Sequence, residues 1–269
     1  MKFDITIWSE AVDVIRANLA LFAVVVGLVW LADTAIYAFQ PDAQIPFFVT
    51  FFAGIYLAVA SHATILRNIS GYAALKELDK KAFQRFMWRT GAIAILGFIP
   101  SMAVLMAVIV LLDGVIANKD AMILIAMMAV LVGYGVVTLL LLSLIGTWLP
   151  AAIVADGSNL KQAFLRGRKT IAYVITRLLI GPGGNVLLFL ITLFLLPVWV
   201  PDSISGYTIK LGVIQLVPFD IVLNGFANLV WATGTVLIAV VLSRAYLLGE
   251  AGLPKTNEQR EELATSDVV

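Results

Sequence analysis

The chain has 269 residues, of which 61% are hydrophobic and 13% charged, and its formal net charge is +1. A soluble domain is roughly 45 to 50% apolar and about 25% charged, so this composition excludes an ordinary water-soluble globule and predicts a surface that faces lipid. The small net charge gives no argument for nucleic acid as a partner, and the absence of cysteine excludes disulfides, thiolate metal sites and a thiol nucleophile.

Six apolar runs are each long enough to cross the hydrocarbon core of a bilayer, which takes about 20 helical residues. Helices are preferred to strands because the runs are continuous, whereas the strands of a membrane barrel alternate apolar and polar residues. The sequence therefore predicts an all-α polytopic transmembrane bundle of six helices. In chain order, the predicted spans are Asn18 to Phe39, Ile45 to Leu66, Gly91 to Leu112, Ala121 to Trp148, Thr176 to Val200 and Ile221 to Leu248.

A charged segment with an apolar residue every three to four positions precedes the first, third and fifth spans, and this is the spacing of one helix face. Each segment predicts an amphipathic helix in the headgroup plane. We therefore expect one integral membrane domain over residues 1–250, built from three units of interfacial helix plus transmembrane hairpin, and a disordered polar tail over 251–269. The units are residues 1–66, 70–154 and 158–250, and Ser158 is the expected N-cap of the third interfacial helix.

Lys and Arg are distributed unequally between the two sides of the predicted bundle. Sixteen of the eighteen lie before the first span, in alternate connections or near the C-terminus, and only Lys119 and Lys210 lie in the opposite connections. Short loops rich in Lys and Arg stay in the cytoplasm. Both termini are therefore expected there, in a bacterial inner membrane, with the phospholipid bilayer and a membrane protein or second copy of the chain as partners.

One segment resembles a known family. An apolar run ends in Trp148-Leu149-Pro150, a short polar turn ends at Ser158, and an amphipathic segment with Ala163 and Arg166-Gly167-Arg168 follows. This pattern resembles the membrane domain associated with bacterial glycerophosphoryl diester phosphodiesterases and related YciC-like proteins, as does the opening segment with Ala11, Arg16 and Asn18. The resemblance implies a six-span domain and little chemistry, because the phosphodiesterase activity of that family belongs to a separate soluble domain.

A helix-breaking segment lies in the fifth span. Pro182 removes one backbone hydrogen bond and clashes with the carbonyl four residues earlier, so local unwinding is expected over Gly181 to Asn185, a segment that includes Gly183. The segment is either a kink or reentrant turn, or a discontinuous helix that binds an ion or substrate, as in many transporters.

Four polar residues lie inside other apolar runs. Asp33 and His62 are near opposite ends of the first hairpin and are not expected to pair. An interfacial aspartate and a neutral histidine bonded to a neighbouring helix are the first expectation, and a proton relay is the alternative. Asn224 and Asn228 are one turn apart and share a helix face, where they either hydrogen-bond across a helix interface or line a polar pathway.

Basic residues at the cytoplasmic ends of the spans are candidate contacts for phospholipid headgroups. The alternative is that they only orient the chain, as positive residues of inside loops do. The candidates are Lys80, Lys81, Arg85, Arg89, Arg166, Arg168 and Lys169.

Catalysis has little support, because the chain has one histidine and no HExxH, GxSxG or Walker motif. No catalytic residue, metal or cofactor is predicted. The leading hypothesis is a non-enzymatic membrane protein that acts as scaffold, assembly factor or accessory subunit of a membrane complex or lipid-handling system. The alternative is a transporter or channel for a small solute or lipid, which would need a polar path linking Asp33, Asn185 and Asn224.

Overall fold

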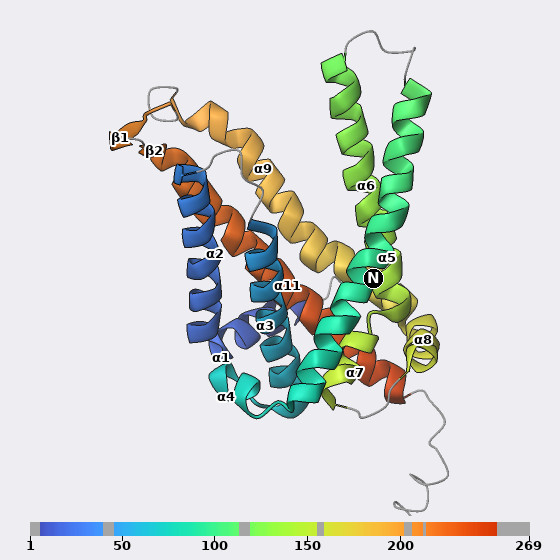
Figure 1. The fold of residues 1–269 in the computed structure, drawn as a ribbon. Helices are drawn as coiled ribbons and strands as arrows, with labels where there is room; N and C mark the ends of the chain where they lie inside the picture. Colours follow the sequence, from blue (N-terminus) through green and yellow to red (C-terminus); the bar gives the residue numbers. More distant parts are fainter. Residues whose placement is uncertain are drawn as a thin grey trace, which may run out of the picture.

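The structure is a computed structural model that describes residues 6–39, 46–112, 119–154, 159–201, 206–211 and 214–251. It is helical almost throughout, and six of its helical stretches are long and apolar enough to cross a membrane (Figure 1). The prediction of a multi-pass helical bundle is thereby confirmed. Ser158 and residues 252–269 of the predicted tail lie outside the described residues.

The helices follow the predicted spans closely, because long continuous apolar runs determine both. Within the described ranges, the departure from an all-α fold is a short antiparallel hairpin in which Ile209 pairs with Leu216. The elements are α1 (Thr6–Ala17), α2 (Leu19–Phe39), α3 (Pro46–Arg67), α4 (Gly71–Lys76), α5 (Lys80–Leu112), α6 (Lys119–Ile145), α7 (Trp148–Val154), α8 (Leu160–Leu178), the π-helical turn η1 (Leu179–Gly183), α9 (Gly184–Trp199), β1 (Ile209–Leu211), β2 (Ile214–Leu216) and α11 (Pro218–Ala251).

The three predicted interfacial segments take three different forms. The first is a separate helix, α1, which meets α2 at Asn18. The second is divided: α4 ends at Lys76, and α5 starts at Lys80 and runs without interruption into the third span. The third forms α8, which continues through η1 into the fifth span, and its N-cap is Asn159, whose side chain accepts the Gln162 N–H at 2.9 Å. The expectation of one interfacial helix separate from the span that follows it was therefore wrong for the second segment.

Asn18 holds the α1–α2 corner to the turn between α3 and α4. It is 2% exposed. Its Nδ2 donates to the Val14 carbonyl at 2.8 Å and to Thr64 Oγ1 at 2.9 Å, and its Oδ1 accepts the Gly71 N–H at 2.6 Å. Gly71 has a positive φ of 62°, which glycine adopts without steric cost and which turns the chain into α4.

The core is built around α11, which crosses the bundle diagonally and packs against α1, α2, α3, α8 and α9 (Figure 1). Its middle is almost completely buried, with Val236, Leu237, Val240 and Leu242 each exposed by 1% or less. We call the end of the bundle that carries α1, α4, α7, α8 and the start of α5 the basic end; the β1–β2 hairpin lies at the opposite end (Figure 1).

Helix α8 approaches its neighbours closely because two positions at its contacts lack a side chain. A Cβ atom on Gly167 would overlap the carbonyl of Leu144 in α6. A Cβ atom on Gly249 of α11 would lie 2.8 Å from Cβ of Arg166. The backbone of α8 is therefore seated between α6 and α11 at the basic end.

Candidate functional site

The polar residues within the spans form hydrogen bonds between helices. Asn228 Nδ2 of α11 donates to Asp33 Oδ2 of α2 at 2.9 Å, and Asn185 Nδ2 of α9 donates to the Val230 carbonyl of α11 at 2.7 Å. Asn224 is half-buried one turn before Asn228. Asn228 and Val230 are two residues apart on α11, about 3 Å along its axis, so these bonds join α2 and α9 to the same turn of that helix.

The helix-breaking segment does not unwind. Residues Leu179–Gly183 form a π-helical turn, and the helix continues on both sides of Pro182. A π-turn absorbs a missing backbone donor by widening one turn, so the expectation of local unwinding was wrong. Gly181 is buried against Ile7 and Leu237, while Gly183 is exposed.

His62 is bonded to a neighbouring helix, as the sequence analysis expected. Its Nδ1 lies 2.7 Å from Ser243 Oγ of α11, and its ring makes an edge contact with Phe86 of α5 at a centroid distance of 5.5 Å. It does not pair with Asp33, which is bonded to Asn228. The partner residue, Ser243, could not be found from sequence because it lies 181 positions away.

A cationic hollow lies at the basic end, on one face of α5. Lys81, Arg85 and Arg89 follow one another at intervals of four residues, so their side chains share this face. Arg89 is held against α7: its Nη1 donates to the Trp148 carbonyl at 2.6 Å, and its Cζ lies 5.0 Å from the centre of the Trp148 ring. We define the cationic hollow by its lining residues, Lys81, Gln84, Arg85, Trp88, Arg89, Ala92 and Trp148.

Helix α5 is longer than one crossing of the hydrocarbon core requires. A helix of 33 residues is about 50 Å long, while the hydrocarbon core is about 30 Å thick. The apolar part from Gly91 to Leu112 spans that core by itself, so residues 80–89 extend beyond it. Trp88, which is 75% exposed, fits the aromatic belt at the membrane–water boundary.

Arg166 does not belong to the headgroup surface. It is 1% exposed, its Nη1 lies 2.6 Å from Glu250 Oε1, and its Cζ is 5.0 Å from the centre of the Tyr246 ring. The prediction of a headgroup contact was therefore wrong for this residue. Gly167 and Gly249 allow α8 to lie close to α6 and α11, which buries the arginine side chain. Lys80, Arg168 and Lys169 are exposed, and they lie outside the lining of the cationic hollow.

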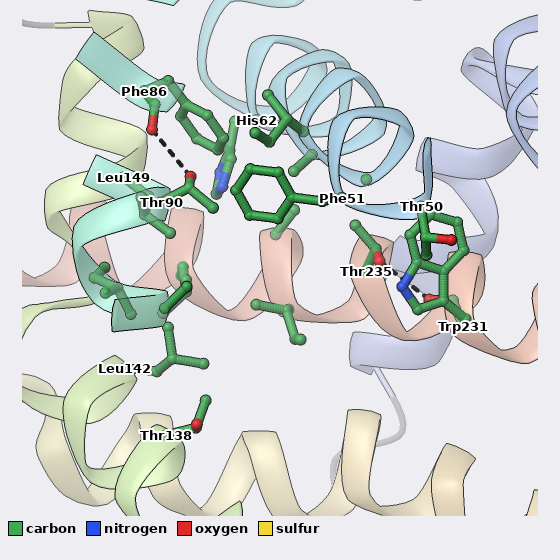
Figure 2. A pocket seen from close by; sticks show the side chains of 18 of the residues that line it. Thr50, Phe51, His62, Phe86, Thr90, Thr138, Leu142, Leu149, Trp231 and Thr235 are labelled. Carbon is green, nitrogen blue, oxygen red and sulfur yellow. Dashed lines mark hydrogen bonds between the residues drawn. The ribbon is translucent and has the colours of Figure 1, made fainter. Parts of the chain in front are cut away.

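A second, apolar cavity of about 400 Å³ lies between the α5–α6 hairpin and the α3–α11 pair (Figure 2). Its lining is aliphatic and aromatic, with His62 and a few hydroxyl groups as the polar side chains. Of the polar residues predicted within the spans, only His62 is part of this lining. The polar path that a transporter would need through Asp33, Asn185 and Asn224 does not coincide with the cavity.

No protein-family model, curated protein or solved structure matches the chain. The resemblance of the segment from Trp148 to Arg168 to the YciC-like membrane domain therefore stays a prediction. Among the described residues, no group of three or more His, Asp or Glu side chains comes together to hold a metal ion.

Proposed function

We propose that this chain is a non-enzymatic membrane protein that binds anionic phospholipid at the cationic hollow. In this role it acts as a scaffold, assembly factor or accessory subunit of a membrane complex or lipid-handling system. The proposal places it in a bacterial inner membrane with both termini in the cytoplasm, so that the basic end faces the cytoplasmic leaflet, as the positive-inside bias favours.

The observation that carries the proposal is the combination of three cations and two indoles where a spanning helix leaves the hydrocarbon core. Like charges at intervals of four residues on a helix repel one another, and a phosphate group among Lys81, Arg85 and Arg89 would offset that repulsion. Arginine binds phosphate oxygens through two parallel N–H groups. Trp88 and Trp148 would flank the glycerol region below the phosphate.

The test is native mass spectrometry of the protein released from nanodiscs that contain phosphatidylglycerol and phosphatidylcholine. Each basic residue near the surface contributes about 1 kcal/mol to binding of anionic lipid, so the double change Lys81→Gln and Arg85→Gln should weaken retention of phosphatidylglycerol about thirtyfold. The phosphatidylcholine signal should not change, because that headgroup has no net charge.

A matched control separates a site from a generally positive surface. Lys161→Gln with Arg168→Gln removes the same charge from exposed positions of α8 at the same end of the bundle. The proposal expects this pair to retain phosphatidylglycerol as the unmodified protein does. Equal loss in both double variants would leave only a diffuse surface attraction and would refute a defined headgroup site.

A further inference from the structure

The positive charge of the cationic hollow exceeds what one phosphodiester can offset. Three of its lining residues are cations, and none of the described residues that line it is Asp or Glu. The first turn of α5 carries no acidic residue either, although the N-terminus of a helix is itself partly positive and favours acids. A phosphodiester such as phosphatidylglycerol brings a single negative charge, so it would leave two of the three cations without a counter-charge.

The cations are spread along the axis of α5 rather than gathered at one height. Lys81, Arg85 and Arg89 are separated by four residues each, so successive cations lie about 6 Å apart along the axis. Helix α5 is one of those long and apolar enough to cross a membrane. In the proposed membrane placement the row therefore crosses the headgroup layer instead of running within its plane. A matching ligand carries its charges one behind the other, in line with its tail.

Exposure differs along the row and separates two levels of contact. Lys81 and Gln84 at the outer end are exposed, and Arg85 is half-buried. Arg89 is 7% exposed, and its Nη1 donates to the Trp148 carbonyl. Arg89 therefore contributes its charge from the inner end of the hollow, while a bound headgroup is contacted at the level of Arg85 and again at the level of Lys81.

The inner end of the hollow continues onto a lipid-facing surface of α5. Its lining there consists of Trp88, Ala92 and Trp148. Ile95 and Ile99 follow Ala92 by three and seven residues, the spacing of one helix face, and both are exposed. A hydrocarbon chain attached to a headgroup in the hollow can leave past the small side chain of Ala92 and lie along this face.

We propose that the cationic hollow binds a lipid diphosphate, a hydrocarbon tail that ends in two phosphate groups linked in line. The inner phosphate accepts two N–H groups of Arg85, beside the charge of Arg89. The outer phosphate accepts from Lys81 and from the Gln84 amide, and the tail leaves past Ala92. This inference rests on the proposed function, because it names the anionic lipid of the same hollow, and it assigns no reaction.

The test is native mass spectrometry of the full chain released from phosphatidylcholine nanodiscs that contain geranylgeranyl diphosphate and geranylgeranyl monophosphate in equal amounts. The two lipids share one tail and differ by the outer phosphate. We expect the diphosphate to be retained about fivefold more, which is the contribution of one further basic residue near the surface. Cardiolipin carries two phosphates side by side, so its advantage over phosphatidylglycerol should stay below about twofold.

Adjacent lysines provide the matched variants. Lys81→Gln should lower the ratio of diphosphate to monophosphate from about fivefold to near one. Lys80→Gln removes the same charge from an exposed residue outside the lining of the hollow, and the ratio should stay at about fivefold. Both changes are at exposed positions, so both variants should elute from size exclusion as the unmodified protein does.

The source of the diphosphate is distinguished by a second lipid. Cytidine diphosphate–diacylglycerol carries the same linked phosphates on a different tail and with a nucleoside beyond them. Its retention at the level of geranylgeranyl diphosphate would show that the linked phosphates alone are recognised. Its exclusion would restrict the ligand to a hydrocarbon chain with a terminal diphosphate.

Three results would overturn the inference: equal retention of the diphosphate and the monophosphate, an advantage of cardiolipin as large as that of the diphosphate, or the same loss in Lys80→Gln as in Lys81→Gln. If phosphatidylglycerol is still lost from the Lys81→Gln and Arg85→Gln double variant, the headgroup site of the proposed function stands and only the diphosphate is refuted. If that loss is absent as well, both proposals fail.

Discussion

Gly167 lets α8 lie close to α6, so we expect its replacement to destabilise the fold. Replacing it with alanine puts a Cβ atom into the space of the Leu144 carbonyl, carbonyl carbon and Cα, all of them backbone atoms that no rotamer change can move. Overpacking a core usually costs about 1 to 3 kcal/mol, and backbone overlap belongs at the upper end. Alanine recovers about 0.5 to 1 kcal/mol of helix propensity, so we expect Gly167→Ala to lower the free energy of unfolding by about 2 kcal/mol.

The assay is reversible unfolding in mixed micelles of mild detergent and dodecyl sulfate, followed by tryptophan fluorescence. Gly135→Ala in α6 is the matched control, because a Cβ atom there meets no atom within 4 Å, and it should be neutral or slightly stabilising. If Gly167→Ala unfolds at the same dodecyl sulfate fraction as Gly135→Ala, α8 does not lie as close to α6 as described.

Two further predictions concern individual contacts, and one concerns the topology. Asp33→Asn should leave unfolding nearly unchanged, because an amide oxygen also accepts from the α11 asparagine; a drop of more than about 1 kcal/mol would show that the charge itself matters. Arg166→Ala should destabilise by about 2 to 4 kcal/mol, because it leaves a gap between α8 and α11; Glu250 is 42% exposed and is solvated without its partner, so adding Glu250→Gln should change the result little in the same unfolding assay. A single cysteine at Tyr207 should react with an impermeant thiol reagent in intact cells and one at Lys161 should not; the reverse pattern would invert the proposed topology.

The spanning helices could be predicted to within a few residues at most ends, because hydropathy over about 20 residues depends on composition and not on neighbours. In the fifth span, by contrast, the backbone conformation around the proline could not be predicted from hydropathy. The pattern located Pro182 correctly, yet a missing backbone donor can be accommodated by unwinding, by a kink or by a π-turn. The choice among these depends on what packs around the turn, such as Ile7 and Leu237 against Gly181.

Long-range packing also decides which basic residues are buried in an ion pair and which line the cationic hollow. The sequence treated Arg85, Arg89 and Arg166 alike, because each lies in a charged segment beside a span. Their environments differ through long-range contacts: Arg166 meets Glu250, 84 residues later, whereas Arg89 meets Trp148 at the edge of an open hollow. The four-residue spacing of Lys81, Arg85 and Arg89 was the available signal for the hollow.

The polar contacts indicate which parts of the bundle are fixed to one another. Lipid tails are as apolar as leucine, so spanning helices gain no hydrophobic driving force from packing, and interhelical hydrogen bonds count for more. Five helices are joined to α11 by such contacts, through Arg244 with Glu10 of α1, Asn228 with Asp33 of α2, Ser243 with His62 of α3, Glu250 with Arg166 of α8 and the Val230 carbonyl with Asn185 of α9. Helices α5 and α6 pack most extensively against each other, and then against α7 and α8 respectively. The α5–α6 hairpin is thus packed on the rest of the bundle chiefly through α7 and α8, and the apolar cavity lies where the hairpin meets the α3–α11 pair.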